Sequence, residues 1–321
     1  MANLDENKVK YSVVVPVYNE QGNVVKLHQE ILETMNRLGE PFEMIFIDDG
    51  SVDKTLSEMA NLQPLTIIIF RKNFGQTAAM DAGIKQAEGE FIITLDADLQ
   101  NPPAEILRLV KQQRKTKADV VSGWRKYRHD PLSKRLASRA ANFMRTLLVK
   151  DGIHDSGCSL KIYRRECFKG VDLHGEMHRF IPAILKLKGF EVTEVVVKHR
   201  PRIHGQTKYN WKRGIKGNID MVAIWFWRKY SARPLHLFGS LGLLFITLSI
   251  IMAAVAIFRK LAYGADLSDT ALTIFAGFCF LFGIQFFISG LLADIAIKNH
   301  YATTKTTNYA IRKVIKNERL T

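Results

Sequence analysis

The stretch that decides the fold is FIITLDADLQ, residues 91–100, in which the apolar run Phe91–Leu95 is followed at once by two aspartates and a glutamine. Continuous apolar runs of this length are typical of strands that are buried on both faces of a sheet. Three similar runs rich in Val and Ile precede it: Ser12–Val17, Glu43–Ile47 and Thr66–Phe70.

Amphipathic segments of helical length alternate with these four runs. We predict helices near Gln21–Leu38, Asp53–Leu62, Gln76–Ala87 and Pro103–Lys115. Alternation of buried strands with helices predicts an α/β unit whose parallel sheet is covered on both faces. In such sheets ligands bind at the carboxyl ends of the strands, so the residues just after each strand are the first candidates for a site.

Carboxylates gather at three of these predicted strand ends. The chain reads PVYNE at residues 16–20, DDGSVD at residues 48–53 and DADLQ at residues 96–100. Like charges at one sheet edge are unfavourable unless a cation or hydrogen-bond donors compensate them. Mg²⁺ is typically held by one or two carboxylates together with substrate phosphates, and the i, i+2 pair Asp96 and Asp98 suits that role. The chain has no G-x-x-x-x-G-K-[ST] and no strand-linked G-x-G-x-x-G, which argues against a P-loop NTPase or a Rossmann dehydrogenase.

The formal net charge of +15 is unevenly distributed along the 321 residues. Residues 1–130 carry 16 Lys and Arg against 19 Asp and Glu, residues 131–233 carry 22 against 8, and residues 234–321 carry 8 against 4. The net charges are therefore −3, +14 and +4. The excess in the middle segment fits either a solvated basic face or a surface that meets phosphate and anionic lipid. Nucleic-acid binding is disfavoured because no recognition motif is present.

Two uncharged stretches follow the basic segment. Leu235–Phe258 and Thr270–Ala293 each run for 24 residues without Asp, Glu, Lys or Arg. About 20 apolar helical residues cross a bilayer core, so we predict two transmembrane helices rather than two buried core helices. Basic residues are denser on both outer flanks than in the connecting loop, which by the positive-inside rule places the 233-residue N-terminal part and both termini in the cytoplasm. The polar N-terminus predicts no cleavable signal peptide.

Amphipathic stretches lie between the sheet and these helices. In Trp211–Tyr230 the apolar residues recur at steps of three and four with Lys and Arg elsewhere, which indicates a helix in the membrane interface. Pro131–Lys150 has a similar face, although a core-facing helix explains it nearly as well. Three Cys without a C-x-x-C spacing exclude a disulfide framework and fit a reducing compartment. His174 and His178 lack the Glu of a zinc H-E-x-x-H motif.

A set of motifs in fixed order carries a family resemblance. They are VVVPVYNE, FIDDGSVDKT, RKNFGQTAAMDAG, LDADLQNPP, VSGWR, HDSGCSLKIYRR, HGEMHRFIP and HRPRIHGQTKYN. Over about residues 10–300 the chain resembles glycosyltransferase family 2, and in particular its polyprenyl-phosphate branch, which includes dolichol-phosphate mannose synthases and undecaprenyl-phosphate glucosyltransferases. The resemblance implies a GT-A fold, a Rossmann-like, mixed and mostly parallel sheet. It implies membrane-interface helices and two C-terminal transmembrane helices around that fold.

By the same resemblance, one set of residues holds the nucleotide-linked donor. Asp96 and Asp98 would bind Mg²⁺ or Mn²⁺ at the diphosphate, with Gln100 beside them. Arg202 and Lys208 match basic residues on a segment that closes over the diphosphate. The nucleoside would be held by Pro16, Tyr18, Glu20 and Asp48 or Asp49.

A second set corresponds to the acceptor phosphate site, namely Arg125, Lys134, Ser138 and Arg139. Lys134 and Lys161 stand where many relatives have Arg, which matters because Arg grips phosphate with two parallel N–H bonds and Lys acts as a point charge. Asp155 matches a residue proposed as base or orienting group, and we favour orientation, or tuning of nearby Arg and Lys, over proton abstraction because a lipid monophosphate is already largely ionised. An Asp that caps a turn before Gly157 is the simpler alternative.

These features predict an inverting sugar transfer from a UDP- or GDP-linked donor to a polyprenyl phosphate. The expected organisation is a catalytic domain at 1–210, an interface helix at 211–233, a two-helix anchor at 234–297 and a basic tail at 298–321. The resemblance also suggests a homo-oligomer, by analogy a tetramer, in the cell membrane. Two alternatives remain open: a membrane glycosyltransferase with a glycolipid or protein acceptor, and a non-enzymatic membrane scaffold.

Overall fold

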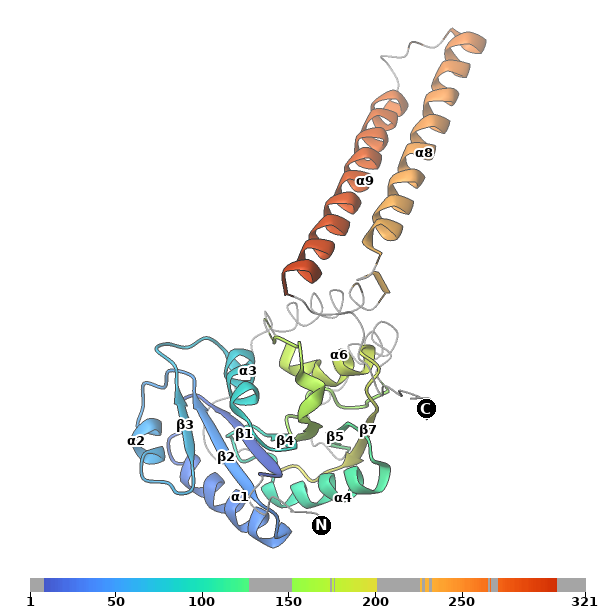
Figure 1. Cartoon of the computed structure of the whole chain (residues 1–321). Coiled ribbons are helices and arrows are strands. Elements are labelled where there is room, and N and C mark those ends of the chain that lie inside the picture. The colour runs from blue at the N-terminus through green and yellow to red at the C-terminus, as the bar shows by residue number, and fades with distance from the viewer. Residues whose placement is uncertain are drawn as a thin grey trace, which may run out of the picture. The chain divides into compact units, whose positions relative to one another are not determined.

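The computed structural model forms two compact units, of which the first contains a sheet and the second a pair of long helices (Figure 1). The structure describes residues 9–126, 152–173, 175, 177–200, 226, 229–230, 233–264, 266 and 271–304. The described residues up to 200 belong to the first unit, and those from 226 onward belong to the second.

The first unit is built on a seven-stranded sheet with the order β3-β2-β1-β4-β6-β5-β7. Its strands are β1 Tyr11–Val17, β2 Phe42–Asp48, β3 Thr66–Ile69, β4 Phe91–Thr94, β5 Val120–Trp124, β6 Lys161–Arg164 and β7 Val192–Val196. β1 pairs in parallel with both β2 and β4, and β2 pairs in parallel with β3. The predicted parallel α/β sheet is therefore confirmed for these four strands, with bounds that differ by at most one residue at either end.

Strand β6 runs against its neighbours and makes the sheet mixed. It pairs antiparallel with β4, where Lys161 lies opposite Thr94, and antiparallel with β5, where Lys161 lies opposite Ser122. β7 then pairs in parallel with β5. Because β6 is reversed, its first residue lies at the edge where β4 and β5 end. The segment that leads into β6 is thereby brought to the same edge as the strand-end carboxylates.

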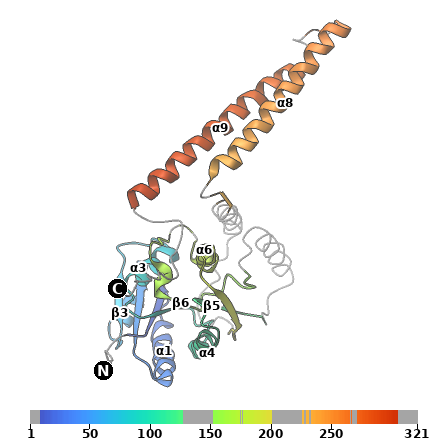
Figure 2. The ribbon, with the colours of Figure 1, turned by 45° about the vertical axis from the view of Figure 1, so that its right-hand side comes forward.

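Helices cover both faces of the sheet, with α1 and α4 on one side and α3 and α6 on the other (Figures 1 and 2). The described helices of this unit are α1 Val24–Leu38, α2 Thr55–Met59, α3 Gln76–Gln86, α4 Ile106–Thr116 and α6 Ile181–Leu187, with short 3₁₀ turns η1 Pro103–Glu105, η2 Arg165–Phe168 and η3 Met177–Arg179. The helix predicted for Asp53–Leu62 is only five residues long, and α1 begins three residues later than predicted because Gly22 adopts a left-handed φ of 81°.

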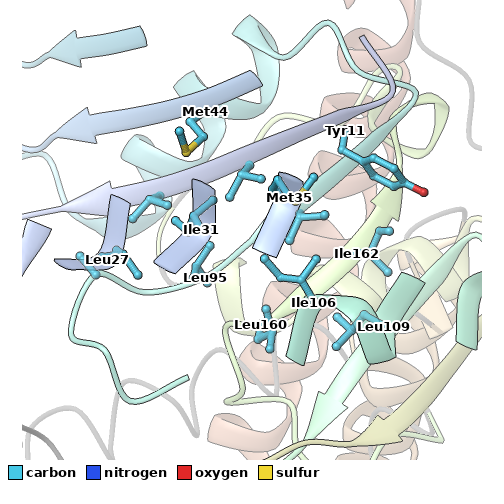
Figure 3. Close-up of a cluster of buried hydrophobic side chains, with 14 of the residues drawn as sticks. Tyr11, Leu27, Ile31, Met35, Met44, Leu95, Ile106, Leu109, Leu160 and Ile162 are labelled. Carbon is cyan, nitrogen blue, oxygen red and sulfur yellow. The ribbon is translucent and has the colours of Figure 1, made fainter. Parts of the chain in front are cut away.

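Alternation along the strands divides the core into two layers. Val13 and Val15 face α1 and α4, whereas Val14 faces α3 and α6. Figure 3 shows the first layer, in which Leu27, Ile31 and Met35 of α1 lie close to side chains of α4 and of the sheet. These α1 residues are spaced by four and are fully buried, so one helical stripe closes this face of the sheet.

The second unit is a helical hairpin formed by α8 Pro234–Tyr263 and α9 Ala271–Thr304. Both helices are long and apolar enough to cross a membrane, with mean hydropathies of 2.7 and 2.2. They confirm the two predicted apolar helices and continue for several residues beyond the predicted C-terminal ends. The predicted interface helices at 131–150 and 211–230 lie almost entirely outside the described residues, which include only 226, 229 and 230 of the second.

Small residues bring α8 and α9 into close contact. A Cβ placed on Gly242 would lie 2.8 Å from the Gly283 carbonyl oxygen, so that crossing leaves no room for a side chain. The Ser249 hydroxyl donates to the Ala276 carbonyl oxygen at 2.8 Å, and Phe245 packs against Phe286. Small residues and serine hydroxyls are the usual means by which helices associate without a hydrophobic driving force.

Candidate active site

The candidate site lies where strands β1, β2 and β4 end. β1 pairs with both of the other strands in parallel, so their carboxyl ends meet at one edge of the sheet. The strand order reverses between β1 and β4, which is the place where open α/β sheets bind ligands. Of the predicted site residues, the structure brings seven to this edge, at the ends of these strands or in the loops that follow them: Tyr18, Glu20, Asp48, Asp49, Asp96, Asp98 and Gln100.

The loops after β1 and β2 are hydrogen-bonded to each other. The Asn19 N–H donates to Ser51 Oγ at 3.0 Å, and Asn19 Oδ1 accepts the Val52 N–H at 2.9 Å. The Glu20 N–H donates to Thr55 Oγ1 at 2.9 Å. Asn19 itself has a φ of 53°, a conformation that Asn tolerates better than most residues. Tyr18 and Glu20 are half-buried on this cross-linked pair of loops, whereas Pro16 is buried inside β1.

The two aspartates at the end of β2 have different surroundings. Asp48 is the last residue of the strand and accepts the Ser51 N–H at 3.3 Å. Asp49 accepts the N–H of Phe74 at 2.7 Å and that of Gly75 at 2.9 Å, just before α3 begins. Burial raises the pKa of Asp49, and the charge of Asp48 adds to that rise, while the two backbone hydrogen bonds oppose it. Asp49 therefore fixes the start of α3.

A strained turn carries the Asp96–Asp98 pair. Leu99 has a left-handed φ of 59° although its side chain is buried, a conformation that costs an L-residue on the order of 1–2 kcal/mol. The Gln100 N–H donates to Asp98 Oδ1 at 3.2 Å, and the Gln100 carbonyl oxygen accepts the Arg200 N–H at 2.8 Å. These bonds hold the turn, so Asp98 and Gln100 are presented at a fixed position.

The Asp96 carboxylate accepts a hydrogen bond from Gln76 Nε2 at 2.7 Å. Burial raises the pKa of Asp96 above its usual range, and the nearby charge of Asp98 raises it further, while a hydrogen bond from the Ser159 side chain opposes the rise. Two carboxylates that repel each other in this way form a donor set of hard oxygens. Within the described part of the chain no cluster of three or more His, Cys, Asp or Glu residues is present. The pair therefore fits an ion such as Mg²⁺ or Mn²⁺, which completes its shell with phosphate oxygens and water.

A buried ion pair lies where β5 ends and β6 begins. Arg125, directly after β5, donates from Nε to Asp155 Oδ2 at 2.7 Å and from Nη2 to Asp155 Oδ1 at 3.0 Å, and its backbone N–H also reaches Asp155. The two side chains are only 8% and 11% exposed. This fork-to-fork geometry is the strong form of the interaction. Asp155 is thus the buried partner of Arg125.

A second buried cation supports the turn that carries Asp155. Lys161, at the start of β6, is almost completely buried, and its Nζ donates to the carbonyl oxygens of Cys158 and, at 3.3 Å, Ser156. Burial lowers the pKa of Lys161 and raises that of the Cys158 thiol. Lys161 is the residue that stands where many relatives have Arg. Its ammonium group binds the backbone of the segment that follows Asp155 and so helps to hold that turn in place.

The remaining predicted residues are outside the described part of the chain: Arg202, Lys208, Lys134, Ser138 and Arg139. His174 is also outside it, and His178 is buried with Nδ1 2.7 Å from the Thr77 hydroxyl oxygen. The sequence did not single out Gln76 or Ser159, which both contact Asp96. The only signal for them was their position inside two of the family motifs.

The family assignment follows from comparison with known sequences. The profile described as Glycosyl transferase family 2 matches residues 12–171. The dodecaprenyl-phosphate galacturonate synthase of Rhizobium johnstonii is 36% identical over 95% of this chain and 93% of its own length. The undecaprenyl-phosphate 4-deoxy-4-formamido-L-arabinose transferase of Proteus mirabilis is 33% identical over 95% of this chain and 94% of its own length. The chain belongs to glycosyltransferase family 2 and is a glycosyltransferase.

Solved structures support the fold. The crystal structure of mannosyl-3-phosphoglycerate synthase from Rubrobacter xylanophilus superposes with a TM-score of 0.54 at 17% identity, over 68% of this chain and 74% of that one. A glucosyl-3-phosphoglycerate synthase from Mycobacterium tuberculosis, crystallised with Mn²⁺, UDP-glucose and phosphoglyceric acid, gives 0.52 at 16% identity, over 68% and 79%. At these identities the likeness concerns the GT-A fold alone, and it confirms the predicted fold class for the sheet.

Proposed function

We propose that this chain transfers a sugar from a nucleoside-diphosphate donor to a membrane polyprenyl phosphate, with inversion at the anomeric carbon. The acceptor phosphate oxygen attacks the anomeric carbon in line as the nucleoside diphosphate leaves, so no covalent enzyme intermediate forms. The observation that carries the proposal is the juxtaposition, at one sheet edge, of the Asp96–Asp98 pair with the buried Arg125–Asp155 pair. Relatives named for transfers to dodecaprenyl and undecaprenyl phosphate support the class of acceptor.

The donor is assigned to the loops after β1, β2 and β4. Pro16, Tyr18, Glu20 and Asp48 or Asp49 would hold the nucleoside, of which Asp48 is the better candidate because Asp49 already accepts two backbone N–H groups. Asp96 and Asp98 would hold Mg²⁺ or Mn²⁺, with Gln100 beside them. When bound, the ion would stabilise the negative charge that develops on the diphosphate without any proton transfer. Arg202 and Lys208 are proposed to contact the same diphosphate.

The acceptor phosphate is assigned to Arg125 together with Lys134, Ser138 and Arg139. In this proposal Asp155 orients the Arg125 guanidinium and does not abstract a proton. Both N–H groups that Asp155 accepts lie on the same edge of that guanidinium, so the carboxylate fixes the plane in which Arg125 meets an anion. A polyprenyl phosphate near neutral pH already carries a nucleophilic oxygen.

The two apolar helices are proposed to anchor the enzyme in the cell membrane. Basic residues flank both helices on their outer sides, and the positive-inside rule then places the catalytic unit and both termini in the cytoplasm. The domain division proposed from the sequence, with a catalytic part at 1–210 and an anchor at 234–297, accompanies this assignment. A homo-oligomer, by family analogy a tetramer, is part of the same proposal.

The test is a donor and acceptor panel. Membranes that contain the chain are incubated with undecaprenyl phosphate, Mn²⁺ and nucleotide-linked sugars, beginning with galacturonate and 4-deoxy-4-formamido-L-arabinose because relatives are named for them. We expect one radiolabelled lipid product that bears a single sugar in the inverted configuration. UDP- and GDP-linked forms of the common hexoses complete the panel.

Three outcomes separate the proposal from its rivals. Labelling of a glycolipid or a protein in place of the polyprenyl phosphate would assign a different acceptor to the same fold. Absence of product with every donor, with no effect of Asp98→Asn on donor binding, would contradict the proposal and favour a scaffold. Product that forms equally with Asp98→Asn would contradict the assigned donor site.

A further inference from the structure

The loop Asp96–Asn101 is closed by a buried serine from a distant part of the chain. The Ser159 hydroxyl oxygen accepts the Asp96 N–H at 3.1 Å and Asn101 Nδ2–H at 3.0 Å, so it receives both ends of the loop. The Ser159 carbonyl oxygen accepts the Thr94 hydroxyl at 2.8 Å. Asn101 is 2% exposed and Ser159 9% exposed, which shields these bonds from water.

The bonds from Asp96 and Asn101 both use the Ser159 hydroxyl oxygen as the acceptor. A hydroxyl has one donor and two acceptor sites. The Asp96 N–H and the Asn101 amide therefore use both acceptor sites, and a side chain without an oxygen cannot close the loop in this way.

Ser159 also belongs to the segment that carries Asp155. It follows Cys158, whose carbonyl oxygen is bound by Lys161, and it lies two residues before the start of β6. The loop with the Asp96–Asp98 pair and the turn with the Arg125 partner are thus joined through one side chain. A shift of either one is transmitted to the other because both ends of the loop bond to the same oxygen.

We propose that Ser159 is a positioning residue that fixes the Asp96 carboxylate for a divalent cation and ties the cation loop to the Asp155 turn. This inference rests on the proposed function, in which Asp96 and Asp98 hold the cation. Residues that orient a metal ligand typically change metal affinity by about 10–100-fold when they are replaced. The expected signature is therefore weaker cation binding rather than loss of fold.

The test measures Mn²⁺ binding to the purified full chain in detergent, from the electron paramagnetic resonance signal of free Mn²⁺, with UDP and separately with GDP. We expect Ser159→Ala to weaken Mn²⁺ binding by about 10–100-fold and Ser159→Thr to retain most of it. Ser122→Ala is the matched control, since Ser122 is also buried, on neighbouring β5, and within the described residues its Oγ makes one long bond, to the Gly123 carbonyl oxygen at 3.5 Å. It should bind Mn²⁺ within about twofold of the wild type.

Two further measurements keep the proposal testable. If Ser159→Ala does not fold, Asn101→Ala removes one of the two N–H groups that close the loop and should weaken Mn²⁺ binding in the same direction. The Mn²⁺ concentration for half-maximal activity should rise with the dissociation constant, and saturating Mn²⁺ should restore most of the rate.

Unchanged Mn²⁺ affinity in Ser159→Ala, while Asp98→Asn loses it, overturns the role of Ser159 alone. Failure of the wild type to bind Mn²⁺ with either nucleotide overturns the cation site of the proposed function and this inference with it.

Discussion

The edge of the sheet has two parts that handle charge differently. On the carboxylate side, after β1, β2 and β4, the aspartates accept hydrogen bonds from backbone N–H groups and from the amide of Gln76. On the ion-pair side, after β5 and before β6, Asp155 and Arg125 compensate each other and Lys161 is held by carbonyl oxygens. The carboxylate side therefore carries negative charge that a cation from outside would compensate, whereas on the ion-pair side Arg125 and Asp155 compensate each other and Lys161 adds one positive charge.

The largest expected effect comes from breaking the ion pair. Asp155→Ala leaves the Arg125 guanidinium buried without its partner, which typically costs about 3–5 kcal/mol in the free energy of unfolding. Urea denaturation in detergent measures this loss. The comparison variant is Asp119→Ala, whose side chain is 21% exposed, whose partner Arg164 is 30% exposed, and which also accepts the Glu191 N–H at 2.9 Å, so that its loss should be smaller, about 1–2 kcal/mol. Equal losses in the two variants would show that the Arg125–Asp155 pair contributes no more to stability than this more exposed pair.

On the carboxylate side, Asp98→Asn should affect catalysis more than stability. Loss of an electrostatic contribution to the transition state typically lowers kcat by about 10²–10³-fold. The measurement is the initial rate of lipid-linked sugar formation at saturating Mn²⁺, with thermal unfolding as a check on the fold. Asp119→Asn makes the same chemical change at the start of β5, far from the edge, and should leave the rate unchanged. A fall in rate of less than about fivefold for Asp98→Asn would contradict the role assigned to the carboxylate side.

A smaller effect concerns pH. The raised pKa of Asp96 means that this carboxylate takes up a proton at a higher pH than an ordinary aspartate, so activity that needs its ionised form falls earlier on acidification. Mn²⁺ competes with the proton, and a tenfold increase in its concentration should move the acidic limb down by up to about one pH unit. Profiles of kcat/KM at two Mn²⁺ concentrations test this. A limb that does not move with Mn²⁺ would locate the titrating group elsewhere.

The smallest effect is expected for the thiol beside the ion pair. Burial raises the pKa of Cys158, and burial raises that of Cys167 to about 12, so both stay protonated at pH 8 and are poor nucleophiles. Iodoacetamide should label neither residue in the folded protein, and both in urea, as read by mass spectrometry of peptides. Rapid labelling of Cys158 in the native state would show that the ion-pair side opens. Cys167 serves as the internal reference for a buried thiol away from this edge.

The carboxylate side was largely predictable from the sequence, and the ion-pair side was not. Four Val- and Ile-rich runs predicted β1 to β4 because each contains a single polar residue and is otherwise apolar. β6 begins with the buried Lys161, and β7 is a half-buried strand that lies last in the strand order. Neither strand has the apolar pattern that identifies a strand in the sequence. The sequence indicated β5 only through the motif VSGWR at residues 121–125.

Contacts between side chains were harder to predict from the sequence than the strands. Arg125 and Asp155 are 30 residues apart, and they meet only because β6 is reversed. Ser159 illustrates the same limit, since a serine in SLKIYRR gives no local sign that its hydroxyl closes a loop some 60 residues upstream. Long-range hydrogen bonds of this kind depend on topology and register, which apolar periodicity does not encode.

The reversed direction of β6 affects what determines the distance between Asp155 and the cation loop. Residues that directly follow β1, β2 or β4 are held in place by the pairing of the strand before them. β6 begins at this edge, and its pairing with β4 and β5 starts at Lys161. Asp155 therefore precedes the paired residues of β6. Residues gained or lost between Asp155 and Ser159 would change the span from the guanidinium to the cation loop without moving a single strand. The length of that short connector therefore sets how far Asp155 stands from the cation loop.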